Sequence, residues 1–329
     1  MVRTRVLRHY GAVVLLMVAV ALAYYAAARL GLTLRVRVEG AIVTPLWPPT
    51  GIALAALIWF GLRVWPGIAL GALLVILTIT PFDPHLFGIL AGNTVAPVVA
   101  CLMLRGVGFR PRLDRLRDGL ALVFLGALVG MLISATAASL VLTASQQIAA
   151  DDFWPVWSAW WTGDAMGVLV VTPLLLVARR LRLPTGVPLV RWVEAAALLI
   201  STAVVARIST TSAASLLFLV FPLLVWAALR FELRGTAPCV LIVSVLAISA
   251  ATDHVGPFAG HSLLAVMGTL QALNGSVALT GLLLSAIVAE QRTVRRRIAQ
   301  ACAELEEVVD RLIPEGVARR WRPPEDVGS

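Results

Sequence analysis

Apolar residues along this chain fall into ten segments, separated by short loops that are polar or rich in arginine. Most segments come close to the 20 or so apolar residues that an α-helix needs to cross a bilayer. The pattern therefore predicts an all-α, polytopic transmembrane helical bundle. Segments 50–61 and 65–80 are short, so eight spans plus a re-entrant pair fit as well as ten spans. The ten segments are residues 10–30, 50–61, 65–80, 86–105, 118–143, 157–178, 189–208, 213–230, 236–251 and 263–289.

Composition excludes an ordinary soluble protein. Of the 329 residues, 60% are hydrophobic and 14% charged, whereas a soluble domain carries roughly 25% charge. The basic start, residues 1–10, resembles a signal peptide, but further spans follow and we interpret it as the start of an uncleaved first span.

The distribution of positive charge predicts how the chain lies in its membrane. Lysine is absent, so all 27 basic residues are arginine, and the net charge is +9. If the N-terminus is cytoplasmic, every arginine except Arg29, Arg35, Arg37 and Arg207 falls on the cytoplasmic side, as the positive-inside rule requires. We therefore expect a multi-pass membrane protein with both termini in the cytoplasm. The positive net charge is then explained by orientation of the chain in the lipid bilayer, and it does not indicate a nucleic-acid partner.

A carboxylate stands inside one of the apolar segments. Asp164 lies within the stretch 157–173, and an ionisable group at membrane depth is costly and therefore a functional candidate. Trp160, Asp164 and Gly167 share one helix face. A carboxylate satisfied by donors within a static bundle is the structural alternative.

Polar groups on other segments fall at a similar depth, in the outer half of the predicted bundle. They either satisfy one another or line a cavity reached from outside. Tryptophans there serve as walls for a cationic guest or as membrane anchors. Glycines 51, 92, 163 and 167 leave room for close helix packing or for a guest. The candidate ligand-binding residues are Asp164, Trp160, Trp161, Asn93, Thr94, Trp47, Thr50 and Thr136.

The sequence offers no catalytic, metal or cofactor motif. Phosphate loops, nucleophile elbows, zinc signatures and kinase-type motifs are absent. His85, His254 and His261 fall near Asp83 and Asp253, but their spacing is not that of a metal site. Three scattered cysteines predict neither a disulfide framework nor a metal centre.

The chain changes character after Glu290. Residues 291–313 predict a cytoplasmic signalling helix whose apolar positions alternate spacings of four and three, which is a short heptad seam. The alternative is a solvated amphipathic tail. Residues 314–329 read as a linker or as the truncated start of an output domain. The seam residues are Ile298, Cys302, Leu305, Val309 and Leu312.

Several of these segments together resemble the MASE1 family of bacterial integral membrane sensor domains. The likeness covers about residues 10–290, and WPPTG at 47–51 and WWTGDAMG at 160–167 are its most specific parts. The resemblance implies a sensory input module that lies in the bacterial inner membrane and sits upstream of a signalling output domain. The segments that carry it are Trp47–Gly51, Phe60-Gly61, Trp65–Gly67, Gly71, Gly92–Thr94, Ser134–Thr136, Trp160–Gly167 and Pro173.

These observations predict a non-enzymatic membrane sensor with residues 1–290 as its sensor domain. We expect it to detect an extracytoplasmic or membrane-embedded small molecule, to form a homodimer, and to pass the signal to a cytoplasmic output domain or a membrane partner. A small-molecule permease or transporter component is one alternative, because broken spans with polar residues also occur there. A scaffold that docks another membrane protein is the other.

Overall fold

The computed structural model describes residues 2–33, 35–38, 41–80, 83–180, 186, 188–212 and 216–312, and within them the predicted all-α bundle is confirmed. The strands within these residues form one antiparallel hairpin, in which Val36 pairs with Val43; the sequence pattern did not predict it. In chain order the elements are α1 (Val2–Leu32), β1 (Val36–Val38), β2 (Ala41–Val43), α2 (Pro48–Phe60), η1 (Leu62–Val64), α3 (Trp65–Ile79), α4 (Leu86–Gly106), α5 (Leu116–Ala121), η2 (Leu122–Val129), α6 (Leu132–Ala144), η3 (Ala150–Asp152), α7 (Phe153–Met166), η4 (Gly167–Val171), α8 (Thr172–Ala178), α9 (Leu189–Thr211), η5 (Leu217–Leu219), α10 (Val220–Phe231), α11 (Leu233–Thr252), η6 (Gly256–Phe258) and α12 (Leu263–Leu312).

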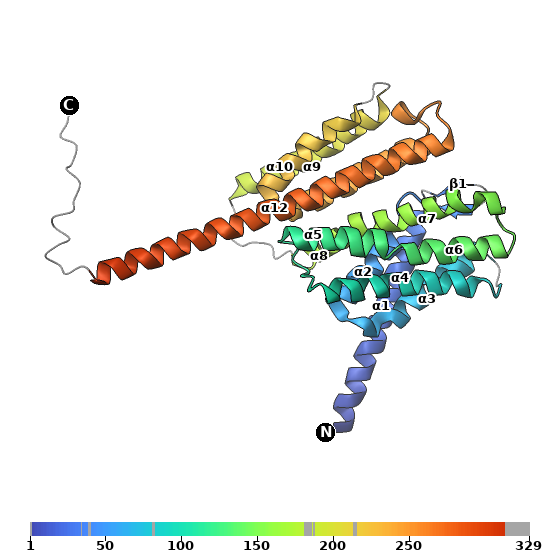
Figure 1. The fold of residues 1–329 in the computed structure, drawn as a ribbon, viewed down its shortest axis with the longest axis horizontal. Helices are drawn as coiled ribbons and strands as arrows, with labels where there is room; N and C mark the ends of the chain where they lie inside the picture. Colours follow the sequence, from blue (N-terminus) through green and yellow to red (C-terminus); the bar gives the residue numbers. More distant parts are fainter. Residues whose placement is uncertain are drawn as a thin grey trace.

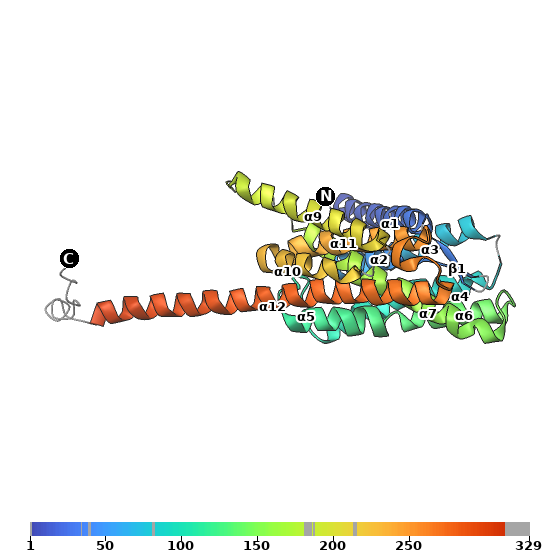
Figure 2. The same ribbon diagram turned by 90° about the horizontal axis from the view of Figure 1, so that it is seen from above.

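Most of the helices run roughly along one axis, so the bundle has two ends (Figures 1 and 2), and α1 crosses this axis steeply in Figure 1. We call the end that carries Arg63, Arg105 and Arg179 the arginine end, and the opposite end, which carries β1 and β2, the far end. Eight helices in the described residues are long and apolar enough to cross a membrane. The segments Pro48–Phe60 and Leu217–Phe231 are apolar but shorter.

The turn between α2 and α3 lies at the arginine end. Arg105 donates a hydrogen bond to the carbonyl oxygen of Leu57, and the guanidinium of Arg179 stacks over the rings of Trp59 and Phe60. A re-entrant pair entered from the far end would instead turn in the middle of the bundle. The turn therefore lies level with the arginine ends of α4 and α8.

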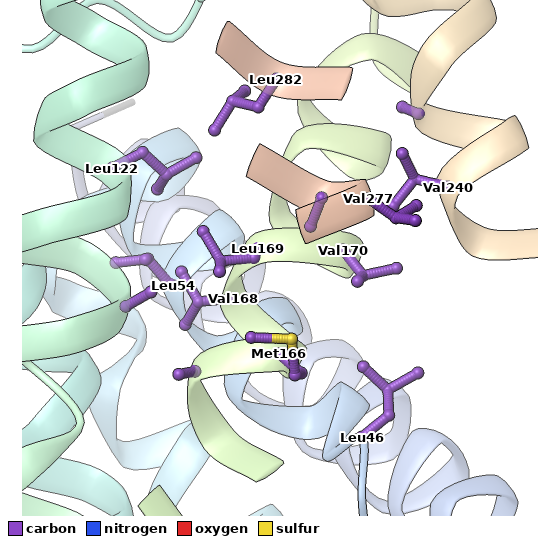
Figure 3. Packing of buried hydrophobic residues seen from close by; sticks show 14 of the residues in the cluster. Leu46, Leu54, Leu122, Met166, Val168, Leu169, Val170, Val240, Val277 and Leu282 are labelled. Carbon is purple, nitrogen blue, oxygen red and sulfur yellow. The ribbon is translucent and has the colours of Figure 1, made fainter. Parts of the chain in front are cut away.

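The span made of α7, η4 and α8 is the most enclosed. In its most apolar part 67% is buried, against 17% for α9, which faces outward. Pro173 explains the π-helical turn at η4, because proline has no N–H and its ring clashes with the carbonyl four residues earlier, here Leu169. Figure 3 shows side chains of Met166, Val168 and Leu169 packed among residues of neighbouring helices. This span therefore lies at the centre of the bundle.

The predicted C-terminal helix is confirmed, and it is continuous with the last span. α12 has 50 residues, which corresponds to a length of about 75 Å at the helical rise. Figures 1 and 2 show that its C-terminal part extends beyond the other helices. Ile298 and Leu305 are 59% and 63% exposed, so the first part of the seam is not covered by any described part of the chain. The side chains of Val309 and Leu312, and residues 314–329, lie outside the described residues.

Candidate functional site

Two hydroxyl groups hold Asp164 inside the bundle. Thr50 donates to carboxylate oxygen Oδ1 at 2.6 Å, and Ser134 donates to Oδ2 at 2.5 Å. The three side chains come from α2, α6 and α7, and Asp164 is 1% exposed. Each oxygen receives one donor and retains a free lone pair, so the carboxylate can still accept hydrogen bonds from a further group.

Small residues on α7 and η4 let the chain before α2 lie directly against them. A Cβ at Gly163 would collide with the carbonyl oxygen of Thr44, and one at Gly167 with that of Trp47. The amide of Trp47 donates to the carbonyl oxygen of Gly163 at 3.0 Å. We call residues 44–47 the strap. At these positions the glycines serve close chain packing, one of the two roles that the sequence left open.

A cavity of about 420 Å³ lies beside Asp164, towards the far end. This volume is within the usual range for small-molecule sites. Its walls come from α1, the strap, α3, α4, the end of α6 and α7. Most of the lining is aliphatic, including Val75, Ile76 and Ile89, so a guest would be held mainly by apolar contact and oriented by a few polar groups.

Those polar groups include no cation. Among the lining residues Asp164 is the one with an acidic side chain, and no arginine or histidine lines the cavity. A buried carboxylate without a counter-ion is unfavourable by several kcal/mol. A guest with a positive charge or several N–H donors would offset that cost. Trp47 and Trp160 also line the cavity and supply aromatic faces that attract cations.

Four of the eight predicted site residues line the cavity, namely Asp164, Trp160, Asn93 and Trp47. Thr50 lies behind Asp164 and acts through its hydrogen bond.

The other three lie elsewhere. Trp161 donates to the carbonyl oxygen of Leu128, Thr94 donates to its own helix at Leu90, and Thr136 is exposed and accepts from Trp157. None of these three lines the cavity.

Other lining residues had not been singled out from sequence. Tyr24 of α1 is 1% exposed, and Tyr24, Thr44 and Gln147 all line the cavity. A tyrosine within the first apolar segment was the available signal for Tyr24, but a tyrosine in a span usually lies near the membrane interface. Ser134 belongs to a segment that carries the family resemblance, but the sequence does not assign it to the site.

The strap also contacts α12. Gln271 donates from Nε2 to the carbonyl oxygen of Pro45 at 3.2 Å, while its Oε1 is buried without a partner among the described residues. Asn274, one helical turn further, is fully buried, and neither atom of its amide has a described partner. Buried polar groups are normally satisfied. This face of α12 is therefore imperfectly matched to its surroundings.

Within the described residues, no three His, Cys, Asp or Glu side chains lie close enough to hold a metal ion. His85 uses its backbone amide to bond Asp83, and the His261 ring lies 2.8 Å from the carbonyl oxygen of Ala259.

The family model MASE1 matches residues 16–292, which includes every helix from most of α1 to the point where α12 leaves the bundle. No curated protein and no solved structure matched the chain.

Proposed function

The chain belongs to the MASE1 family of membrane sensor domains, and we propose that it is the input module of a signalling system that binds a small molecule beside Asp164. The observation that carries the proposal is the cavity of about 420 Å³ with one buried, uncompensated carboxylate in its wall. The chemical class that fits is a compact molecule with a protonated amine and an apolar or aromatic body. Because the cavity lies towards the far end, the orientation predicted from the arginines makes the ligand extracytoplasmic.

The strap supplies a route from ligand to output. Thr44 and Trp47 line the cavity, and Pro45 between them is bonded to Gln271 of α12. A guest that displaces the strap therefore moves a partner of the helix that leaves the bundle. The unsatisfied amides of Gln271 and Asn274 support a second packing of α12, since a shift that pairs them would offset the loss of other contacts. A ligand with different affinities for the two packings would carry the signal.

The exposed seam on α12 supports a dimer as the receiving unit. Ile298 and Leu305 are apolar and exposed in the single chain, and a second copy packed in parallel would cover them. A cytoplasmic output domain or a membrane partner would respond to the rotation or separation of the two helices.

The permease alternative has less support. A transporter needs a route from the cavity to the arginine end, but the space between Asp164 and the arginine end is filled with apolar side chains. Leu54, Val168 and Val170 are at most 1% exposed. Figure 3 shows Leu54 beside Val168, and Val170 on the other side of the helix, towards Val240 and Val277. No observation favours a docking scaffold over a sensor.

The test is a thermal-stability screen of purified full-length protein against small amines and their neutral analogues. We expect amines to raise the unfolding temperature of the native protein, and Asp164→Asn to abolish the effect. Asp118→Asn is the matched control, because Asp118 is a buried carboxyl that does not line the cavity. Equal stabilisation of native protein and Asp164→Asn by the same amine would contradict the proposed role of the carboxylate.

A further inference from the structure

A second cavity, of about 540 Å³, lies at the arginine end where the loop before α5, α8, α11 and α12 meet. Three arginines from three separate segments line it: Arg112 after α4, Arg180 after α8, and Arg234 in the first turn of α11. It shares no lining residue with the cavity beside Asp164. It is therefore a separate site.

The charge in this cavity is not neutralised from within the described residues. The carboxylates that line it are Asp114 and Glu232, and Glu232 is already paired with Arg292 at 2.7 Å. The guanidinium groups of Arg112, Arg180 and Arg234 have no ion pair or hydrogen bond to any described residue. The three guanidinium groups thus outnumber the one carboxylate left to oppose them. The start of α11 adds partial positive charge from its helix dipole.

Orientation in the membrane explains why arginines gather at this end, but not why these three meet around one hollow. Other arginines there are used locally: Arg117 donates to the carbonyl oxygen of Val107, and Arg179 stacks on Trp59. Guanidinium groups match the geometry of phosphate oxygens and bind them through paired hydrogen bonds.

We propose that this cavity binds a phosphate-bearing anion through Arg112, Arg180 and Arg234. Two sources share this chemistry, the headgroup of an anionic phospholipid in the adjoining leaflet and a soluble phosphate compound. The cavity also borders Ser285 and Ala289 of α12. An anion bound there would hold α8 and α11 against α12 where that helix leaves the bundle.

The experiment measures binding of two probes to purified full-length protein in uncharged detergent: short-chain phosphatidylglycerol and inorganic pyrophosphate. Short-chain phosphatidylcholine is the lipid control without net charge. Arg112→Lys, Arg180→Lys and Arg234→Lys keep the positive charge that orients the chain but lose the paired hydrogen bonds of the guanidinium. Each should weaken binding about tenfold, the loss of one strong contact.

Arg63→Lys is the matched control, because Arg63 is exposed at the same end and does not line the cavity. Preferential binding of phosphatidylglycerol identifies a lipid headgroup, and preferential binding of pyrophosphate identifies a soluble anion; both support the site. If neither phosphatidylglycerol nor pyrophosphate binds, the proposal is overturned. So would equal weakening in Arg63→Lys and the three cavity variants, since the arginines would then act only as bulk charge. Asp164→Asn should bind both probes normally, which separates this site from the amine site.

Discussion

The hydrogen bond from Thr50 to Asp164 gives the most direct test of the site. Thr50→Val keeps the shape of the side chain and removes one of the two donors to a carboxylate that is 1% exposed. A hydrogen bond to a charged group contributes about 1.5–3 kcal/mol. We therefore expect the substitution to lower the free energy of unfolding by about 2 kcal/mol.

A double-mutant cycle separates this bond from general packing. In an Asp164→Leu background the threonine hydroxyl has lost its acceptor, so Thr50→Val should cost nothing or stabilise the protein. The coupling energy should then be about 2 kcal/mol, whereas independent sites deviate from additivity by only about 0.3–0.5 kcal/mol.

The chain carries its own probes for the measurement. Cys101 and Cys239 are buried and Cys302 is exposed, so a thiol-reactive fluorophore labels Cys302 in the folded protein and the other two only on unfolding. Denaturation in mixed micelles, followed by this signal, yields the free energy for each variant. Additive effects of Thr50→Val and Asp164→Leu would refute the hydrogen-bonded arrangement. Thr162→Val is a control outside the site, because Thr162 bonds only within its own helix.

Other substitutions test the strap, the connection to α12 and the seam. Gly167→Ala should destabilise the protein by about 1–3 kcal/mol in the same assay, because a Cβ would overlap the carbonyl oxygen of Trp47; a neutral result would mean that the strap does not lie against η4. Gln271→Leu removes the hydrogen bond to the strap and should leave the affinity for the amine within about twofold of the native value. It should reduce the ligand-induced change in the mobility of a spin label at Cys302. An undiminished change in mobility would show that this hydrogen bond does not transmit the signal. Oxidation should cross-link Cys302 between copies in native membranes, and Leu305→Pro should abolish the cross-link by breaking the helix; cross-linking that persists in Leu305→Pro would exclude the seam as the contact.

Much of the fold was predictable because its signals are local. A run of apolar residues must span or be buried, whatever its neighbours are, and so all ten segments contain helix, most of them close to their predicted limits. The exceptions include α1, which begins at Val2, and α12, which continues to Leu312. In the structure Pro48 begins α2, Gly61 follows its end, and Pro173 lies just after the π-helical turn. A lone carboxylate in an apolar run is also visible in the sequence, so Asp164 could be selected as a candidate before any contact was known.

Rotation of each helix about its own axis was not predictable in the same way. Trp160 and Trp161 are adjacent and equally deep, yet only Trp160 lines the cavity, because successive residues point about 100° apart. A span that is apolar nearly all round gives no amphipathic pattern from which to read the buried face. Because their depth in the membrane is similar, the sequence placed Thr94 and Thr136 in the same site as Asn93. The rotation of each helix directs only Asn93 into the cavity.

The sequence by itself determined the class of protein, the number of apolar segments and the one acidic residue that requires an explanation, since each depends on the cost of polar groups in an apolar medium. Only the tertiary structure decided which partners meet. Thr50 and Ser134 stand 114 and 30 positions from Asp164, and the strap that joins the cavity to Gln271 reads in the sequence as an ordinary loop. Contacts between segments so far apart depend on how apolar surfaces pack, and no pattern along one segment contains that information.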